Sequence, residues 1–248
     1  MRSSEILLTL FFMIPLFCKA QDGSSIVEKM DQHLRGKTSK SKMTIKVVRP
    51  DWTQTKKIKT WSKGNDYAMV LVTAPSREEG TAFLKRGDEI WNWVPRVERT
   101  IKLPPSMMSQ SWMGTDFTND DLVEQASMVT DYKHKKVGDS TIRGRDCYEV
   151  RLTPKEGKAV VWGKVKLYIG KEHSIEMRSE YYDETGELIN VMKSYDVKKI
   201  GGRQMAERME MIPQDKAGHK TVMIREKMSF NETIEDSFFT TRKMKSLR

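Results

Sequence analysis

The sequence contains little cysteine and little histidine, and both shortages exclude classes of protein. Its two cysteines are Cys18, in a segment that we expect to be removed, and Cys147. A mature chain with a single cysteine cannot form an internal disulfide, so its stability must come from a core. The four histidines lie far apart, and no pair has the close spacing of a helical zinc site.

A long apolar run and a linker rich in proline or glycine are also lacking. The mostly apolar stretch 6–17 has 12 residues, fewer than the ~18 expected of a membrane-spanning helix. Arg2 precedes it, and Cys18 and Ala20 place small side chains where a signal peptidase recognises its substrate. We therefore interpret residues 1–20 as a secretory signal peptide and residues 21–248 as a single domain.

Cys18 raises the alternative of a lipid anchor. Lipoprotein cleavage requires a leucine three residues before the cysteine and a small residue just before it. Pro15 and Phe17 occupy these positions. We therefore favour a periplasmic protein released from its signal peptide over one anchored at Cys18.

The mature chain is expected to be basic. Loss of Arg2, Lys19 and Glu5 leaves 42 basic and 33 acidic residues, a net charge of +9. Export argues against nucleic acid as a partner, so anionic lipid head groups and transient contact with a membrane surface are the preferred counter-charges. For most of the lysines, simple solvation of exposed strand faces is the better explanation.

Patterns typical of catalysis or metal binding are absent from the sequence. Ser106 and Ser111 lack the flanking glycines of a hydrolase nucleophile. Asp116, Asp120 and Asp121 are not arranged around the glycine of a calcium loop. We therefore expect no enzymatic activity, no cofactor and no metal, and we interpret Cys147 as a small buried apolar residue.

The apolar residues repeat with the period of a β-strand along most of the chain. An initial helix is predicted at 25–35, where Ser25 and Glu28 have the spacing of a capping box, and it ends at Gly36. Twelve segments have this pattern and predict a long antiparallel meander, from which we expect a sheet of about ten or eleven strands. They are 42–47, 58–61, 67–71, 82–85, 89–94, 99–103, 148–152, 161–169, 175–181, 188–195, 205–212 and 222–230.

A sheet of this width tends to curl. One face of the predicted strands is apolar and the other is dense in charged residues, so the curl should bury the apolar face. A second, short helix is predicted at 119–127, with Thr118 as its N-cap and Asp120 and Asp121 at its positive end. The predicted fold is mainly β with few helices: a curved antiparallel sheet that forms an incomplete β-barrel covered by helices.

Several motifs resemble a known family. They are Trp-Asn-Trp-Val-Pro at 91–95, Lys-Leu-Pro-Pro-Ser-Met-Met at 102–108 and Ser-Trp-Met-Gly-Thr-Asp-Phe at 111–117, with Gly-Thr-Ala-Phe-Leu-Lys at 80–85 and Val-Val-Trp-Gly-Lys-Val at 160–165. In this order, over about 25–245, they resemble the outer-membrane lipoprotein-sorting proteins, in their LolA-like branch. The resemblance implies an unclosed β-barrel around helices, with an apolar cavity that carries acyl chains across the periplasm. The family's better-studied carriers lack the tryptophan-rich block, so none of their ligand-contacting residues is carried over.

Residues 104–118 are predicted to form a lid over this cavity, and we call them the lid segment. Met107 and Met108 follow two prolines, and Trp112, Met113 and Phe117 are the apolar side chains that would close the barrel. Gly114 would permit a backbone turn among them. The alternative is that these residues plug a fixed core and never move.

Other apolar residues are candidates for the cavity wall. Seven are singled out: Trp61, Met69, Leu71, Phe83, Trp91, Trp93 and Trp162. Trp91 and Trp93 share one face of a predicted strand. Ordinary core packing explains any single one of them equally well. The 15 methionines beyond residue 20 favour an adaptable interior.

These observations predict a monomeric periplasmic carrier that holds acyl chains of lipoproteins or of other envelope lipids. An envelope export permease or an outer-membrane acceptor would be its partner. We expect Trp112→Asp to abolish lipid retention in a folded protein. The alternative is an envelope sensor or exporter-accessory module that uses the same half-barrel to bind a protein partner.

Overall fold

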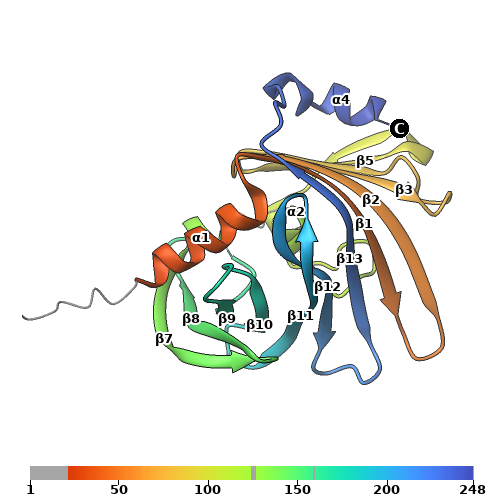
Figure 1. Ribbon diagram of the computed structural model, residues 1–248. Helices are drawn as coiled ribbons and strands as arrows, with labels where there is room; N and C mark the ends of the chain where they lie inside the picture. Colours follow the sequence, from red (N-terminus) through yellow and green to blue (C-terminus); the bar gives the residue numbers. More distant parts are fainter. Residues whose placement is uncertain (1–21, 124–126, 159, 248) are drawn as a thin grey trace, which may run out of the picture.

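The computed structural model describes residues 22–123, 127–158 and 160–247, so the predicted signal peptide and Cys18 lie outside the described residues. Thirteen antiparallel strands form one sheet (Figure 1). None of the described helices is long and apolar enough to span a membrane. The prediction of a mainly β protein with an unclosed antiparallel sheet is confirmed, although the sheet is wider than expected.

The chain enters this sheet at its centre. The first strand, β1 (Thr38–Val48), pairs with the last, β13 (Lys220–Phe230). From β1 the sheet continues outward through β2 (Thr53–Lys63), β3 (Tyr67–Ala74), β4 (Ala82–Arg86), β5 (Glu89–Val94) and β6 (Arg99–Lys102). From β13 it continues through β12 (Arg203–Pro213), β11 (Leu188–Ile200), β10 (Glu176–Tyr182), β9 (Lys164–Gly170), β8 (Arg145–Pro154) and β7 (Tyr132–Ile142). β6 and β7 are therefore the two edge strands.

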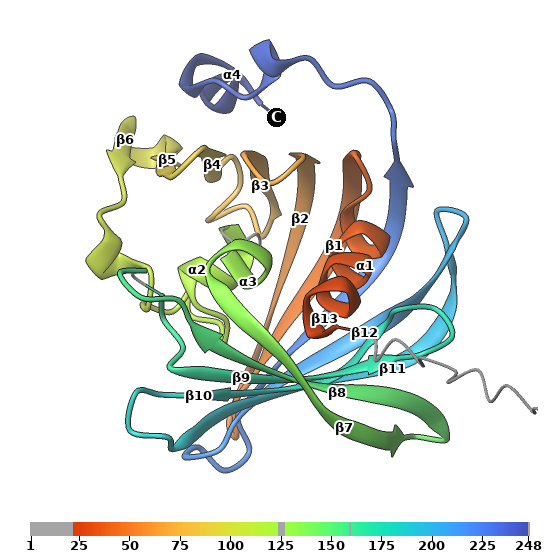
Figure 2. The same cartoon turned by 90° about the vertical axis from the view of Figure 1, so that its left-hand side faces the viewer.

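The sheet is strongly curved, and its two limbs face each other across a concave side (Figure 2). Helices α1 (Gly23–Arg35), α2 (Asn119–Val123) and α3 (Ser127–Thr130) lie on that side. α1 contacts β7 and β8, whereas α2 contacts β3 and β4. Three single turns of 3-10 helix, η1 (Pro95–Val97), η2 (Pro105–Met107) and η3 (Asp236–Phe238), occur in the connections.

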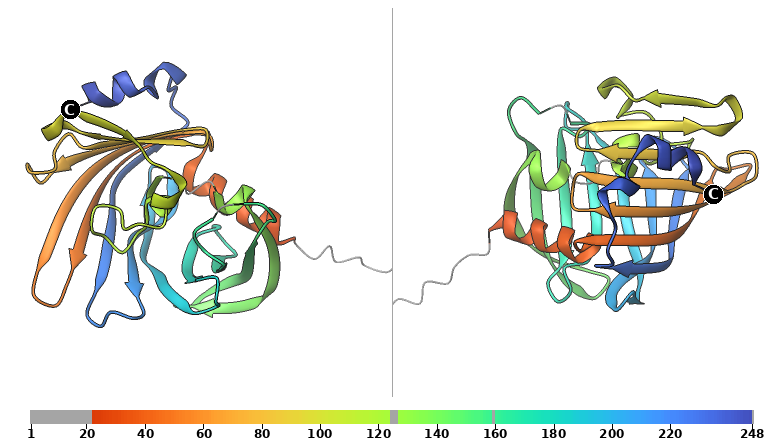
Figure 3. Two further views of the ribbon diagram at one scale, coloured as in Figure 1. Left: turned by 180° about the vertical axis from the view of Figure 1, so that it is seen from behind. Right: turned by 90° about the horizontal axis from the view of Figure 1, so that it is seen from above.

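The C-terminal segment packs on the opposite face of the sheet. Helix α4 (Thr241–Ser246) contacts β4 and β5 and lies across this limb from outside (Figure 3). Ile234, Phe239 and Met244 pack on Met69 and Leu84, and all five side chains are buried. The inward residues of the same strands, Val70, Val72 and Phe83, belong to the main core. β3 and β4 are therefore buried on both faces, which accounts for the apolar character of both sets of alternating residues.

The strand β7 was not predicted. Its burial alternates along the strand, but the half-buried positions after Tyr132 hold His134, Lys136 and Gly138 instead of apolar residues. As an edge strand, β7 pairs on one side only, with β8. Lysines and a bulge between Lys136 and Gly138 are features that discourage pairing of such an edge with another chain.

Of the two predicted helix N-caps, the structure confirms the one at Thr118 and contradicts the one at Ser25. Thr118 and Asp121 form the expected capping box at α2: the Asp121 N–H donates to Thr118 Oγ1 (3.1 Å) and the Thr118 N–H to Asp121 Oδ2 (2.8 Å). The capping box at Ser25 was wrong, because α1 begins at Gly23 and Ser25 Oγ donates to the Asp22 carbonyl. A Cβ atom at Gly23 would lie 2.9 Å from the backbone nitrogen of Lys136, so glycine is required where α1 meets β7.

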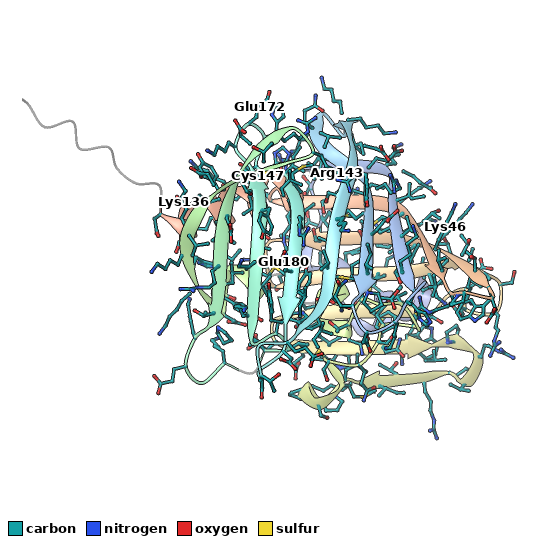
Figure 4. All side chains as sticks on the ribbon, turned by 90° about the horizontal axis from the view of Figure 1, so that it is seen from below. Lys46, Lys136, Arg143, Cys147, Glu172 and Glu180 are labelled. Atoms are coloured by element: carbon teal, nitrogen blue, oxygen red, sulfur yellow. The ribbon has the colours of Figure 1, made fainter. Side chains whose placement is uncertain are left out.

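Charged side chains cover the convex face of β8–β12 (Figure 4, with Glu180 on β10). Several are paired across neighbouring strands: Lys166 lies 2.9 Å from Glu149, and Arg208 lies 2.9 Å from Asp196. Exposed pairs of this kind contribute little stability each. Their arrangement agrees with basic residues that solvate a strand face.

The packing of the C-terminal segment leads to a test. Phe239 has no exposed surface, and Phe239→Ala should lower the free energy of unfolding by about 3 to 5 kcal/mol through lost burial and a cavity. Arg242→Ala, in the same segment but exposed, should change it by less than about 0.5 kcal/mol. Urea unfolding measures both. Equal effects of the two variants would show that this segment does not contribute to the core.

Candidate functional site

A cavity of about 120 Å³ lies on the concave side of the central strands. Methionines supply much of its wall, and the register places them side by side: Met209 of β12 lies opposite Met223 of β13. Met43 of β1 lies opposite Ile58 of β2. Met192 and Met228 also line the cavity, and Phe117 of the lid segment reaches it.

This cavity is small for a ligand site, since pockets for small molecules usually measure roughly 300–1,000 Å³. The described conformation is therefore nearly closed. Methionine side chains are unbranched and flexible, so they change rotamer readily and repack around objects of different shape. A wall built from them can enlarge without breaking the sheet behind it.

The lid segment folds into a compact loop with its aromatic side chains turned inward. The backbone N–H of Trp112 donates to the Phe117 carbonyl (2.8 Å), and Ser111 forms an isolated antiparallel β-bridge with Thr118. Trp112 is fully buried, with its ring 5.6 Å from that of Phe83. Positive φ values at Met113 (49°) and Gly114 (79°) turn the chain between them, and glycine adopts this conformation without strain.

Asp116 holds this loop against the sheet. Its Oδ2 accepts hydrogen bonds from Arg49 Nη1 (3.0 Å) and from Thr221 Oγ1 (2.7 Å), and its N–H donates to Thr221 Oγ1 (2.9 Å). Arg49 also donates to the Gly114 carbonyl (3.0 Å). The side chains of Arg49 and Asp116 are only 11% and 7% exposed. These contacts join the lid segment to β13 and to the end of β1.

Trp162 ties the opposite limb to the start of α2. Its Nε1 donates to Asp121 Oδ1 (3.1 Å), its carbonyl accepts from the Tyr132 hydroxyl (3.1 Å), and its ring packs on Tyr181. Burial raises the pKa of Asp121, while the hydrogen bonds from Thr118 and Trp162 oppose that rise. Burial also raises the pKa of Tyr132.

Among the described residues, three ionisable ones line the cavity: Glu176, Arg225 and Arg35, the last of which is paired with Asp31. Arg225 Nη1 donates to the Ala206 carbonyl (2.7 Å), and its Nε has no hydrogen-bond partner in the described part of the chain. Burial lowers the pKa of Arg225 to about 10, against the opposing effect of Glu176. Burial raises the pKa of Glu176, and a hydrogen bond from Ser179 opposes it. At neutral pH Arg225 is therefore a cation inside the cavity.

The residues that were predicted to form the lid or the cavity wall lie on both faces of the sheet. Phe83, Trp112, Phe117 and Trp162 belong to the inner core, and Met108 and Met113 pack against it. Met107 is half-buried in η2. Met69, Leu71, Trp61, Trp91 and Trp93 belong to the cluster under the C-terminal segment.

Trp91 and Trp93 do not line the cavity, because they pair with Leu84 and Ala82 on the outward face of β4. Trp61 and Met69 border the cavity as well as the outer cluster. The expectation for Trp112→Asp also changes: a carboxylate at a fully buried position would destabilise the fold, so that variant does not report on lipid retention.

The sequence pattern did not single out most of the residues that line the cavity. Arg225, Glu176, Met192, Met209 and Met223 all line it. For the methionines the only signal is their frequency in β12 and β13, which is also typical of an ordinary core.

A surface groove of about 470 Å³ lies beside the open edge of the sheet. Ile90, Leu103, Met108, Val160 and Val161 give it apolar walls, and Asp88, Asp120, Asp131, Lys158 and Glu184 surround them. The lid segment thus contributes Met108 to the groove and Phe117 to the cavity. Among the described residues, no group of acidic, histidine or cysteine side chains is placed to hold a metal ion.

A family model described as "Uncharacterized protein" matches residues 64–246. The structure is similar to a LolA superfamily protein from Nitrosomonas europaea, with 25% identity, a TM-score of 0.78 and coverage of 90% of this chain and 99% of the other. The chain belongs to the family that the matching family model describes, and its fold is that of the LolA superfamily. No curated protein matches the sequence.

Two further solved structures share this LolA-like fold. A DUF1329 family protein from Desulfovibrio piger is 23% identical with a TM-score of 0.81, covering 90% of this chain and 97% of that one. A putative outer membrane lipoprotein-sorting protein domain from Vibrio parahaemolyticus is 20% identical with a TM-score of 0.79, covering 90% and 98%. The unclosed sheet is therefore shared over almost the whole length of all three proteins.

The contacts of Asp116 are testable. Asp116→Ala leaves Arg49 nearly buried without its carboxylate, so the free energy of unfolding should fall by about 3 kcal/mol. The lid segment should also become a site of rapid proteolysis in the folded protein. Asp215→Ala, on an exposed turn, is the control and should change neither property. Unchanged proteolysis of Asp116→Ala would show that other contacts hold the lid segment.

Proposed function

We propose that this LolA-like protein is a periplasmic carrier that holds acyl chains of lipoproteins or other envelope lipids and moves them between membranes. The observation that supports this most is the methionine-lined cavity on the concave face, closed by a loop that is attached through a few polar contacts. The helices on that side cover the mouth of the half-barrel. The protein catalyses no reaction and needs no cofactor.

Energetics explain why a carrier would have this design. Withdrawing a methylene from water is worth ~0.8 kcal/mol, so a chain of sixteen carbons represents roughly 13 kcal/mol. A carrier must offer almost as much burial as the membrane and still release the chain. A wall of flexible side chains around a cavity of only about 120 Å³ avoids a large unfilled apolar void.

Movement of the lid segment provides the route of entry. Its outer side contributes Met108 to the surface groove and its inner side contributes Phe117 to the cavity. Displacement of the loop would therefore join the two spaces into one channel with apolar walls. The lid candidates Met107, Met108, Trp112, Met113 and Phe117 act in this step, and Trp61 and Met69 border the cavity that it opens.

An alternative function is favoured by the edge of the sheet near β6. Val97 and Ile101 are large apolar residues with 61% and 45% of their surface exposed. An exposed edge strand can pair with a strand of another protein. In this alternative the half-barrel is an envelope sensor or an accessory module of an export permease, with lipid as a signal.

The carrier function predicts that protein purified gently from its native envelope retains extractable acyl lipid. Met223→Trp should fold and lose this lipid, because the larger side chain fills the cavity. Met223→Leu keeps a similar volume and should retain the lipid. Mass spectrometry of the intact complexes measures all three samples. Wild-type protein free of lipid, or equal lipid in both variants, would contradict a carrier that uses this cavity.

A further inference from the structure

Arg225 is a buried cation without a carboxylate partner. Its residue surface is 8% exposed, and no ion pair to it occurs among the described residues. Other shielded cations are paired: Lys56 Nζ lies 2.5 Å from Glu78 Oε2, and Arg49 lies 3.0 Å from Asp116. A buried charge without a partner is strongly unfavourable, so Arg225 is an exception that requires an explanation.

The nearest strand neighbours of Arg225 on the inward face are methionines. Arg225 lies opposite Met43 on β1 and follows Met223 on the same face of β13. It lines the methionine-walled cavity and also an adjoining cavity of about 30 Å³ beneath α1. The guanidinium therefore lies at the boundary of two small spaces, with the apolar wall extending away from it along the sheet.

The nearest opposite charge does not neutralise it. Glu176 of β10 lines both spaces, but its carboxylate accepts a hydrogen bond from Ser179 and forms no ion pair with Arg225. In the described part of the chain, the Arg225 guanidinium forms one hydrogen bond, from Nη1 to the Ala206 carbonyl. Among the described residues the buried Nε–H has no acceptor, so a residue that lines the cavity has an unused hydrogen-bond donor.

We propose that Arg225 binds the carboxylate of a single-chain fatty acid, whose hydrocarbon chain lies along Met43, Met209 and Met223. This proposal rests on the carrier function and narrows its ligand to an acyl chain with a free acid end. The guanidinium matches a carboxylate in shape and charge. A single chain requires the least enlargement of a cavity of about 120 Å³.

The position of Glu176 favours a ligand whose end group has one negative charge over a ligand whose end group has two. A phosphate monoester would bring a second negative charge towards this carboxylate in a space with little water. A fatty acid brings only one negative charge, which would lie next to the positive Arg225 guanidinium. The pair thus selects a monoanionic end group over both a neutral one and a doubly charged one.

The test compares three probes with the same chain: hexadecanoic acid, hexadecan-1-ol and hexadecyl phosphate. Delipidated full-length mature protein is titrated with each, and binding is followed by tryptophan fluorescence and calorimetry. A charge-assisted hydrogen bond corresponds to about tenfold to hundredfold in affinity. Wild-type protein should therefore bind the acid at least about tenfold more tightly than the alcohol, and the phosphate more weakly than the acid.

Variants test whether Arg225 is the residue that causes the preference for the acid over the alcohol. Arg225→Gln should weaken acid binding to the level of the alcohol and leave alcohol binding unchanged, and Arg225→Lys should retain part of the preference. Arg208→Gln is the matched control, because Arg208 lies on the neighbouring strand β12, is paired with Asp196 at 2.9 Å and does not line the cavity. It should preserve the preference for the acid. If Arg225→Gln does not fold, the wild-type and Arg225→Lys titrations decide the question.

The outcomes separate this inference from the carrier function. Equal affinity of wild-type protein for acid and alcohol, or equal loss of both in Arg225→Gln, would overturn the assignment to Arg225 while leaving a carrier of acyl chains. Tighter binding of the phosphate would overturn the assignment to a carboxylate. Failure of all three probes to bind, with no lipid in the native protein, would overturn the inference and the carrier function together.

Discussion

The interaction on which the interior depends is the attachment of Asp116 to Arg49 and Thr221. An antiparallel sheet of thirteen strands buries one face by curling, and its edges β6 and β7 remain apart. The space between the limbs holds a loop whose Trp112 and Phe117 are buried and whose Asp116 is bound to the sheet. Apolar burial thus stabilises the closed loop, and a few polar contacts determine its position.

The fold was predictable wherever one face of a strand is apolar and the other polar. The apolar–polar pattern did not predict β7, because its inward positions His134 and Lys136 are polar. It also did not predict how the C-terminal segment packs on the sheet. Met69 and Leu71 alternate with Val70 and Val72, so the strand is apolar on both faces and needs a cover on each. The alternation alone does not identify Phe239 and Met244 as the second cover, since that contact joins residues far apart in sequence.

The candidate site was predictable in part for the same reason. The resemblance to LolA-like proteins drew attention to the lid segment, and Trp112, Phe117 and Trp162 do belong to the inner core. Trp91 and Trp93 are equally bulky, but the register of β4 and β5 turns them to the outer face. A lone Arg225 among strand residues looks like any solvated basic residue. Only the sheet register reveals that it shares an inward face with Met223 and Met43.

The central claim is that an acyl chain occupies the concave face of β11, β12, β13 and β1, behind the lid segment. Cross-linking with a hexadecanoic acid that carries a photoreactive diazirine near the end of its chain tests this most directly. Peptides containing Met192, Met209 or Met223 should be labelled, and an excess of unlabelled hexadecanoic acid should prevent this labelling. Labelling confined to the outer cluster around Trp91 and Met244, or labelling that excess acid does not reduce, would contradict the central claim.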